Sequence, residues 1–238
     1  MKIQEILSSP IYWEMTNSEK IALFSLLSEI KPSISIEIGT KEGGSLQLIS
    51  HFSKKVYSID IDQSVKKLED KFNNVEFLIG DSLHVLPTLL INLEQKGEYP
   101  DFIFIDGNHS TEGVMIDIVN ALKTKVTKKL HILMHDSFNP DCRKGMLQVD
   151  YSSNKSIQFV DIDFVNGIYS PSVSTKSEMW GGFGLIILDS NELITKPIIR
   201  KSSEFSYQMN YTYSTHFLYK PQNILQKIKS YLFRKLYM

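Results

Sequence analysis

The chain has 238 residues, of which 42% are hydrophobic, and its formal net charge is −1. This length suffices for one full hydrophobic core, so one main domain is expected. The near-neutral charge gives no reason to expect a nucleic-acid partner, and the single cysteine, Cys142, excludes an intrachain disulfide. The first ten residues lack the apolar segment of a signal peptide, and no run of about 18 apolar residues occurs. A cytoplasmic protein without a transmembrane segment is expected.

Apolar spacing predicts a first helix over residues 16–30, which Pro32 ends. Five apolar segments follow and are predicted to be strands, at residues 33–38, 55–59, 75–79, 101–105 and 130–134. They alternate with helical patterns at residues 45–52, 63–72, 83–95 and 112–122. Such alternation is typical of βαβ units in a parallel sheet, and continuously apolar strands indicate helices on both faces.

The pattern changes in the last third of the chain. Residues 156–164 and 184–188 are predicted strands without a helix between them, which indicates an antiparallel hairpin at one edge of the sheet. Residues 222–238 have the spacing of an amphipathic helix with a basic face. This helix is expected to pack on the domain or on a second subunit, in a homo-oligomer, rather than on a membrane surface. The expected organisation is an N-terminal helical segment (1–32), a central domain (33–190) and a C-terminal extension (191–238).

A glycine-rich turn follows the first predicted strand, where open α/β sheets bind ligands. Its sequence from Glu37 to Ser45, EIGTKEGGS, lacks the G-x-G-x-x-G spacing of dinucleotide sites. A carboxylate beside the turn would repel a pyrophosphate but suits an ammonium group, whereas Ser45 and the helix N-terminus suit a carboxylate. An amino acid carries both charges. The alternative is a turn that serves only strand-to-helix packing.

Residues at the next two strand ends are suited to bind a further part of this ligand. Asp60 stands where an acid can accept hydrogen bonds from ribose hydroxyls, although Asp62 competes for that role. Asp81 and Ser82 follow the third strand and can reach the polar edge of an adenine. An amino acid joined to a nucleoside is S-adenosylmethionine (SAM).

The turn is followed in order by the segments VYSIDID, FLIGDS, FIFIDGNHSTEG and ILMHDSFNP. This ordered set resembles the class I SAM-dependent methyltransferases. The segments IDGNHSTEG and MHDSF look most like the small-molecule O-methyltransferases of the methyltransferase domain 24 type, which include macrolide sugar methyltransferases and cephalosporin hydroxylase-like proteins. The resemblance covers about residues 33–190. It implies a Rossmann-like α/β fold whose seven-stranded, mostly parallel sheet has an antiparallel last strand.

The resemblance and the charge pattern together predict the cofactor site. SAM would be held by Glu37, Gly39, Thr40, Gly43, Ser45, Asp60, Asp81, Ser82 and Asp106.

His109 is the candidate general base. A hydroxyl nucleophile loses its proton during methyl transfer, and a neutral histidine can accept it near pH 7. Asp106 and Asp136 would orient the acceptor. A helix-capping or solvent-facing role is the alternative for His109.

A divalent metal is a second expectation from the resemblance. In metal-dependent relatives an aspartate after the fourth strand and two acidic or amide residues after the fifth hold Mg²⁺. Here these positions are Asp106, His135 and Asp136, and His135 departs from the pattern. The imidazole would suit Mn²⁺ or Fe²⁺ at least as well as Mg²⁺. Alternatively no metal binds, and the carboxylates orient His109 and the substrate.

The expected acceptor is a small hydroxylated molecule, such as a sugar or a glycosylated metabolite. Trp180 can form an apolar wall for it or close the hairpin as a core residue, and Arg143 can pair with an anionic acceptor or with a nearby carboxylate. The rival function is a SAM-binding regulator or assembly partner without transferase activity. An NAD-linked oxidoreductase is a second rival, which the turn spacing and Glu37 argue against.

Overall fold

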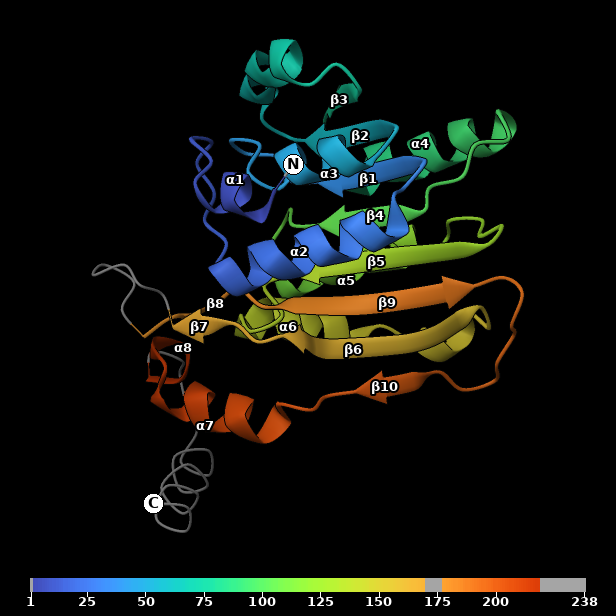
Figure 1. Ribbon diagram of the computed structural model, residues 1–238. Helices are drawn as coiled ribbons and strands as arrows, with labels where there is room; N and C mark the ends of the chain where they lie inside the picture. Colours follow the sequence, from blue (N-terminus) through green and yellow to red (C-terminus); the bar gives the residue numbers. More distant parts are fainter. Residues whose placement is uncertain (1, 170–176, 219–238) are drawn as a thin grey trace.

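The computed structural model describes residues 2–169 and 177–218, and they form a mixed sheet between two layers of helices (Figure 1). The strands are β1 (Ile34–Ile38), β2 (Lys55–Asp60), β3 (Val75–Ile79), β4 (Phe102–Ile105), β5 (Lys129–His135), β6 (Ile157–Val165), β7 (Ile168–Tyr169), β8 (Met179–Trp180), β9 (Phe183–Asp189) and β10 (Ile198–Arg200). The α-helices are α1 (Ile3–Leu7), α2 (Asn17–Ile30), α3 (Leu46–Phe52), α4 (Ser82–Gln95), α5 (Thr111–Ala121), α6 (Pro140–Gln148), α7 (Glu204–Tyr213) and α8 (Thr215–Leu218). Two 3₁₀ helices, η1 (Gln63–Lys71) and η2 (Tyr151–Ser153), complete the described elements.

The main sheet has the strand order β10-β6-β9-β5-β4-β1-β2-β3. The five strands predicted first, β1 to β5, pair in parallel, which confirms the predicted βαβ units. The segment expected to be an α-helix at residues 63–72 is instead the 3₁₀ helix η1.

The predicted antiparallel hairpin is confirmed, and it lies inside the sheet rather than at its edge. Strand β9 pairs antiparallel with both β5 and β6. An eighth strand, β10, pairs in parallel with β6, so the sheet exceeds the expected seven strands. Because β10 has three exposed residues at the edge, it lacks the long apolar run by which the other strands were predicted. The expected long loop also contains a short antiparallel ribbon, β7–β8.

Alternating side chains of the central strands fill two separate cores. Phe102 and Phe104 of β4 pack in one core with apolar residues of α2, α3 and η1. Ile103 and Ile105 pack on the opposite face with residues of α4, α5 and α6. Figure 1 shows the same division, with α2 and α3 on the near face of the sheet. Burial of each such side chain stabilises the fold by about 1.5–3 kcal/mol.

The carboxyl ends of the parallel strands meet at one edge of this sandwich. Gly39 follows β1 with φ +88°, and a Cβ there would lie 2.0 Å from the carbonyl oxygen of Asp106, which follows β4. Glycine alone permits both this backbone conformation and this approach. The glycine turn therefore lies directly against the end of β4.

The amphipathic helix predicted for residues 222–238 lies outside the described residues. Among the helices that are described, none combines the length and the apolar character needed to span a bilayer.

Candidate active site

A cavity of about 1170 Å³ opens at the carboxyl ends of β1 to β5. Its walls come from the glycine turn, from the residues that follow β2, β3, β4 and β5, from residues 12–17, and from Ile168, Trp180 and Gly181. Pockets for one small ligand usually have about 300–1,000 Å³. The cavity thus has room for a cofactor together with a second small molecule.

Glu37 lies beneath the glycine turn and is fully buried. The hydroxyls of Ser45 and Ser58 donate to its two carboxyl oxygens, at 2.6 Å and 3.0 Å, and Ser58 also hydrogen-bonds the Thr40 hydroxyl. Burial, opposed by these two hydroxyls, raises the pKa of Glu37 to about 8. Gly39, Thr40 and Ser45 line the cavity, whereas Glu37 supports the turn through Ser45, and Gly43 faces the side chains of Leu68 and Phe72.

Asp60 ties the glycine turn to β2. Its Oδ2 accepts hydrogen bonds from the backbone N–H groups of Thr40 and Lys41, at 2.8 Å and 3.1 Å. Asp60 lines the cavity, while Asp62 caps η1 by accepting from the N–H of Ser64. Of the two aspartates considered for ribose recognition, Asp60 therefore has the suitable place.

Asp81 and Ser82 lie at the start of α4 and both line the cavity. Asp81 is the N-cap of that helix and accepts from the N–H of Leu83 at 2.9 Å. The Ser82 hydroxyl donates to the buried carboxyl of Asp117 in α5, at 2.7 Å. The cavity wall at this end is thus fixed by the neighbouring helix.

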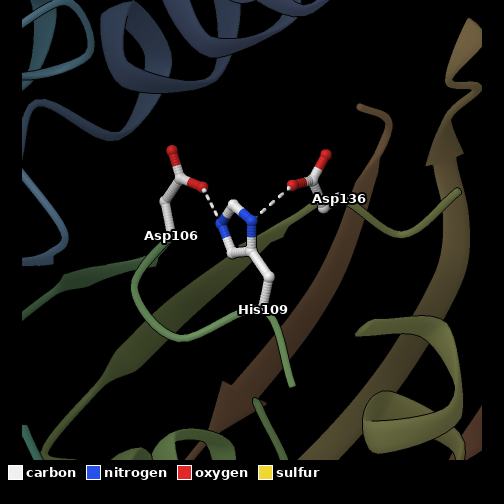
Figure 2. A group of neighbouring side chains, drawn as sticks. All are labelled: Asp106, His109 and Asp136. Atoms are coloured by element: carbon white, nitrogen blue, oxygen red, sulfur yellow. Dashed lines mark hydrogen bonds and ion pairs between the residues drawn. The ribbon is translucent and has the colours of Figure 1, made fainter. Parts of the chain in front are cut away.

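His109 lines the cavity and lies between two carboxylates (Figure 2). Its Nε2 is 3.3 Å from Oδ1 of Asp106, and its Nδ1 is 3.3 Å from Oδ2 of Asp136. The hydrogen bond to Asp106, against the effect of burial, raises the pKa of His109, and Asp136 raises it further. The three residues predicted to carry the chemistry are therefore brought together.

Asp136 is held in an unusual backbone conformation. Its φ is +58°, a region that side-chain-bearing residues seldom adopt, and such strain is concentrated at functional sites. Its Oδ1 accepts from the N–H of Gly181 at 2.5 Å, which leaves Oδ2 facing His109. Burial raises the pKa of Asp136.

His135 is engaged at both ring nitrogens. Nδ1 lies 2.8 Å from Oδ1 of Asp106, and Nε2 lies 3.0 Å from Oε1 of Glu19. Although burial opposes its charge, Asp106 and the other carboxylates raise the pKa of His135 well above 6.5. His135 and His109 in turn lower the pKa of Asp106 against the effect of its own desolvation.

The residues fit a divalent metal, but with a ligand set that differs from the expected one. Asp106, His109 and Asp136 each offer a ligand atom, and these atoms lie within 4.8 Å of one another. His135, expected as the third ligand, has both nitrogens in contact with carboxylates. Two carboxylates and an imidazole form a donor set that suits Mn²⁺ or Fe²⁺ as well as Mg²⁺.

Of the two residues predicted for the acceptor, only Trp180 lines the cavity. Its ring centroid lies 6.0 Å from that of His109. Arg143 is buried away from the cavity and donates to Asp163 at 2.7 Å and to Glu204 at 2.9 Å. Of the two roles considered for Arg143, the pairing with nearby carboxylates is the one that its contacts satisfy.

Sequence reasoning missed the N-terminal contribution to the site. Residues 12–17 form one wall, and Glu19 reaches His135 from the first turn of α2. The only local signal was the spacing of Thr16 and Glu19, which is that of a helix capping box. That signal predicts a helix start and says nothing about a partner so distant in the chain.

Residues 36–137 match a family model described as a methyltransferase domain. A rhamnosyl O-methyltransferase of Mycobacterium leprae is 27% identical over 119 residues, which are 47% of this chain and 52% of the relative. A rhamnosyl O-methyltransferase of Mycobacterium tuberculosis H37Rv is 27% identical over 120 residues, covering 47% and 49%. The chain spans about half the length of these curated relatives.

Solved structures resemble the fold. An O-methyltransferase from Bacillus cereus in complex with SAH has a TM-score of 0.54 at 16% identity, covering 79% of this chain and 90% of its own. The O-methyltransferase TomG from Streptomyces achromogenes in complex with SAM has a TM-score of 0.54 at 16% identity, covering 79% and 86%. These similarities confirm the predicted fold class.

Proposed function

Because residues 36–137 form a methyltransferase domain with the class I SAM-dependent fold, we propose that this chain moves the methyl group of SAM to a hydroxyl of a small sugar or glycosylated acceptor. The single observation that carries the proposal is the position of His109. It stands between Asp106 and Asp136, in the same cavity as a glycine turn suited to an amino acid end.

In this proposal the cofactor lies along the strand ends. The amino acid part is placed at the turn formed by Gly39, Thr40 and Ser45, and the ribose at Asp60. The adenine is placed between Ile61, which is 75% exposed, and the start of α4 at Asp81 and Ser82. An exposed isoleucine in a cavity wall is an apolar surface that a planar base can cover.

Glu37 would act through its neighbours rather than by touching the cofactor. Its carboxyl holds the hydroxyls of Ser45 and Ser58, and these fix the turn. A pKa of about 8 keeps Glu37 largely protonated at neutral pH, so that its charge is a weak source of attraction for the ammonium group.

The reaction would transfer the methyl group from the sulfonium of SAM to the acceptor's hydroxyl oxygen, and the hydroxyl would lose its proton. The hydroxyl oxygen attacks the methyl carbon, the carbon–sulfur bond breaks as the carbon–oxygen bond forms, and SAH and the methyl ether result. His109 takes the proton. Its contacts with Asp106 and Asp136, both 3.3 Å, exceed the 2.7–2.9 Å of strong charge-assisted bonds, so a hydroxyl can replace one of them.

The acceptor's class follows from the wall beside His109. Ile168 and Trp180 pair in the β7–β8 ribbon and both line the cavity. An indole face packs well on the C–H surface of a sugar ring, and carboxylates accept hydrogen bonds from its hydroxyls. The rhamnosyl O-methyltransferases among the relatives are named for a sugar acceptor.

A metal would be held by Asp106, His109 and Asp136. A bound divalent ion acidifies a hydroxyl that coordinates it. His109 cannot then serve as both ligand and base at the same nitrogen, so the metal-dependent reaction and the histidine-base reaction are alternatives. EDTA and added Mn²⁺ distinguish them.

The test is release of SAH from SAM with a panel of sugars and glycosides, with and without EDTA. Product formation with wild type, and its loss in His109→Ala with SAH binding retained, would support the proposal. A protein that binds SAH but methylates no acceptor would instead support the rival function, a SAM-binding regulator. Thermal stabilisation by NAD⁺ and not by SAH would exclude both.

A further inference from the structure

Glu19 belongs to α2, outside the matched domain, and lies 116 positions from His135 in the chain. Its side chain is nevertheless 1% exposed, and it reaches into the group of titratable residues at the cavity. The carboxylate therefore has contacts beyond those that cap its helix.

The helix cap uses only one of the two carboxylate oxygens of Glu19. Oε2 accepts from the N–H of Thr16 at 2.7 Å, which completes the capping box. Oε1 accepts instead from the N–H of Gly182 at 2.7 Å and contacts Nε2 of His135 at 3.0 Å. A buried carboxylate is costly unless it is paired and hydrogen-bonded. Of its partners beyond Thr16, His135 lines the cavity, and Gly182 directly follows the lining residue Gly181.

The contacts of Glu19 reach both carboxylates that flank His109. Through His135 it reaches Asp106, because the ring is held at Nε2 by Glu19 and at Nδ1 by Asp106, and rotation of the ring would break both contacts. Through Gly182 it holds the backbone next to Gly181, whose N–H binds Asp136.

We propose that Glu19 is a positioning residue for the methyl-transfer reaction: it holds His135 and the 181–182 backbone so that Asp106 and Asp136 keep His109 in place. This inference rests on the proposed function, in which His109 is the base. It also makes residues 12–19 an integral part of the site rather than an appendage to the domain.

The variants Glu19→Gln and Glu19→Ala test this role. Glutamine keeps the size of the side chain but replaces one acceptor oxygen by an NH₂ group. That NH₂ group then faces either the N–H of Thr16 or the pair of Gly182 and His135. The matched control is Leu27→Val, which weakens the packing of the same helix at a fully buried position without touching the site.

The expected result is a fall in kcat while the binding of SAH is retained. In Glu19→Gln, kcat should fall on the order of 10-fold to 100-fold, as for small misplacements of catalytic groups, and in Glu19→Ala by more. The Kd for SAH should stay within about threefold, since Glu19 holds groups that are placed beside the acceptor and His109, not beside the cofactor. Leu27→Val should keep kcat within about twofold at temperatures well below its Tm.

A second readout does not depend on turnover. The ring nitrogen and proton chemical shifts of His109 and His135, assigned with His109→Gln and His135→Gln, should change in Glu19→Gln and stay as in wild type in Leu27→Val. Unchanged ring shifts and kcat in Glu19→Gln would overturn the inference, and so would an equal loss of kcat in Leu27→Val. Should wild type methylate no acceptor, the proposed function fails, and the ring shifts alone decide the role of Glu19.

Discussion

The hydroxyl of Ser82, at the start of α4, donates to Oδ1 of Asp117 in α5 at 2.7 Å. The second oxygen of this buried carboxyl, Oδ2, has no hydrogen-bond partner among the described residues. Burial, opposed by the Ser82 hydroxyl, raises the pKa of Asp117 to about 6. Ser82, in the wall of the proposed adenine site, is therefore held by Asp117, a carboxylic acid that is harder to ionise in the folded protein than in the unfolded chain.

Asp117 should make the stability of the protein depend on pH. Because the folded-state pKa of about 6 exceeds the unfolded value, the stability associated with protonated Asp117 is complete below about pH 4 and is lost as the pH rises through 6. Asp117→Asn should thus be more stable than wild type at pH 7.5, by on the order of 1–3 kcal/mol, and similar to it at pH 4.5. Urea unfolding at both pH values measures this difference.

Ser82→Ala provides the check on that cause. Removal of the hydroxyl that lowers the pKa of Asp117 should move the pH-dependent loss of stability to higher pH. A stability difference between Asp117→Asn and wild type that is the same at both pH values would contradict the explanation.

Gly39→Ala should disrupt the site and the fold around it. A Cβ at Gly39 would meet the Asp106 carbonyl oxygen at 2.0 Å, in addition to the strain of φ +88°. Gly97 is a matched control, because it also has a positive φ, +71°, and no atom of the residues that the structure describes, apart from its chain neighbours, lies within 4 Å of its added Cβ. Gly97→Ala should lose about 1 kcal/mol of unfolding free energy, and Gly39→Ala several times more, together with SAH binding. Equal losses in the two variants would show that backbone strain, not the contact with Asp106, is the reason for the glycine.

Glu37→Gln separates support of the turn from direct attraction of the cofactor. A glutamine still hydrogen-bonds the hydroxyls of Ser45 and Ser58, so its Kd for SAH at pH 7 should stay within about threefold of wild type. Glu37→Ala leaves the buried Ser45 hydroxyl without its acceptor and the Ser58 hydroxyl with Thr40 alone, so it should lower stability by about 1–3 kcal/mol and weaken SAH binding clearly. Calorimetric titration with SAH measures the Kd of both variants. A loss of tenfold or more in Glu37→Gln would instead mean that the carboxylate charge itself binds the ammonium group.

Most of the sheet was predictable because its signals are local. Each of β1 to β5 is a short apolar run that ends beside an acidic or polar residue, and parallel pairing brings these ends to one edge. This geometry placed Asp106, His109 and Asp136 together in advance. Strand β10 escaped prediction because three exposed residues at an edge carry no burial pattern.

The contacts between the side chains of the site could not be predicted from the sequence. The sequence indicates which residues lie at a strand end, but not how an imidazole ring is oriented or which distant helix contributes a carboxylate. His135 therefore looked like a metal ligand, whereas its two nitrogens contact Asp106 and Glu19. Arg143 likewise follows β5, but its side chain turns to Asp163 and Glu204.

The pH dependence of kcat should report His109 directly. Its neutral form accepts the proton, so activity should rise with pH, and because Asp106 and Asp136 raise the pKa of His109, the midpoint should lie above 6.5. Asp136→Asn removes one of these two charges and should move the midpoint to lower pH, since the imidazolium loses a stabilising neighbour. His109→Gln should lose about 10²–10⁴-fold in kcat and abolish this acid limb, while binding of SAH remains. The profiles are measured in EDTA, so that no metal competes with the proton for the imidazole. A midpoint that stays fixed in Asp136→Asn would assign the limb to another group and remove His109 from the role of base.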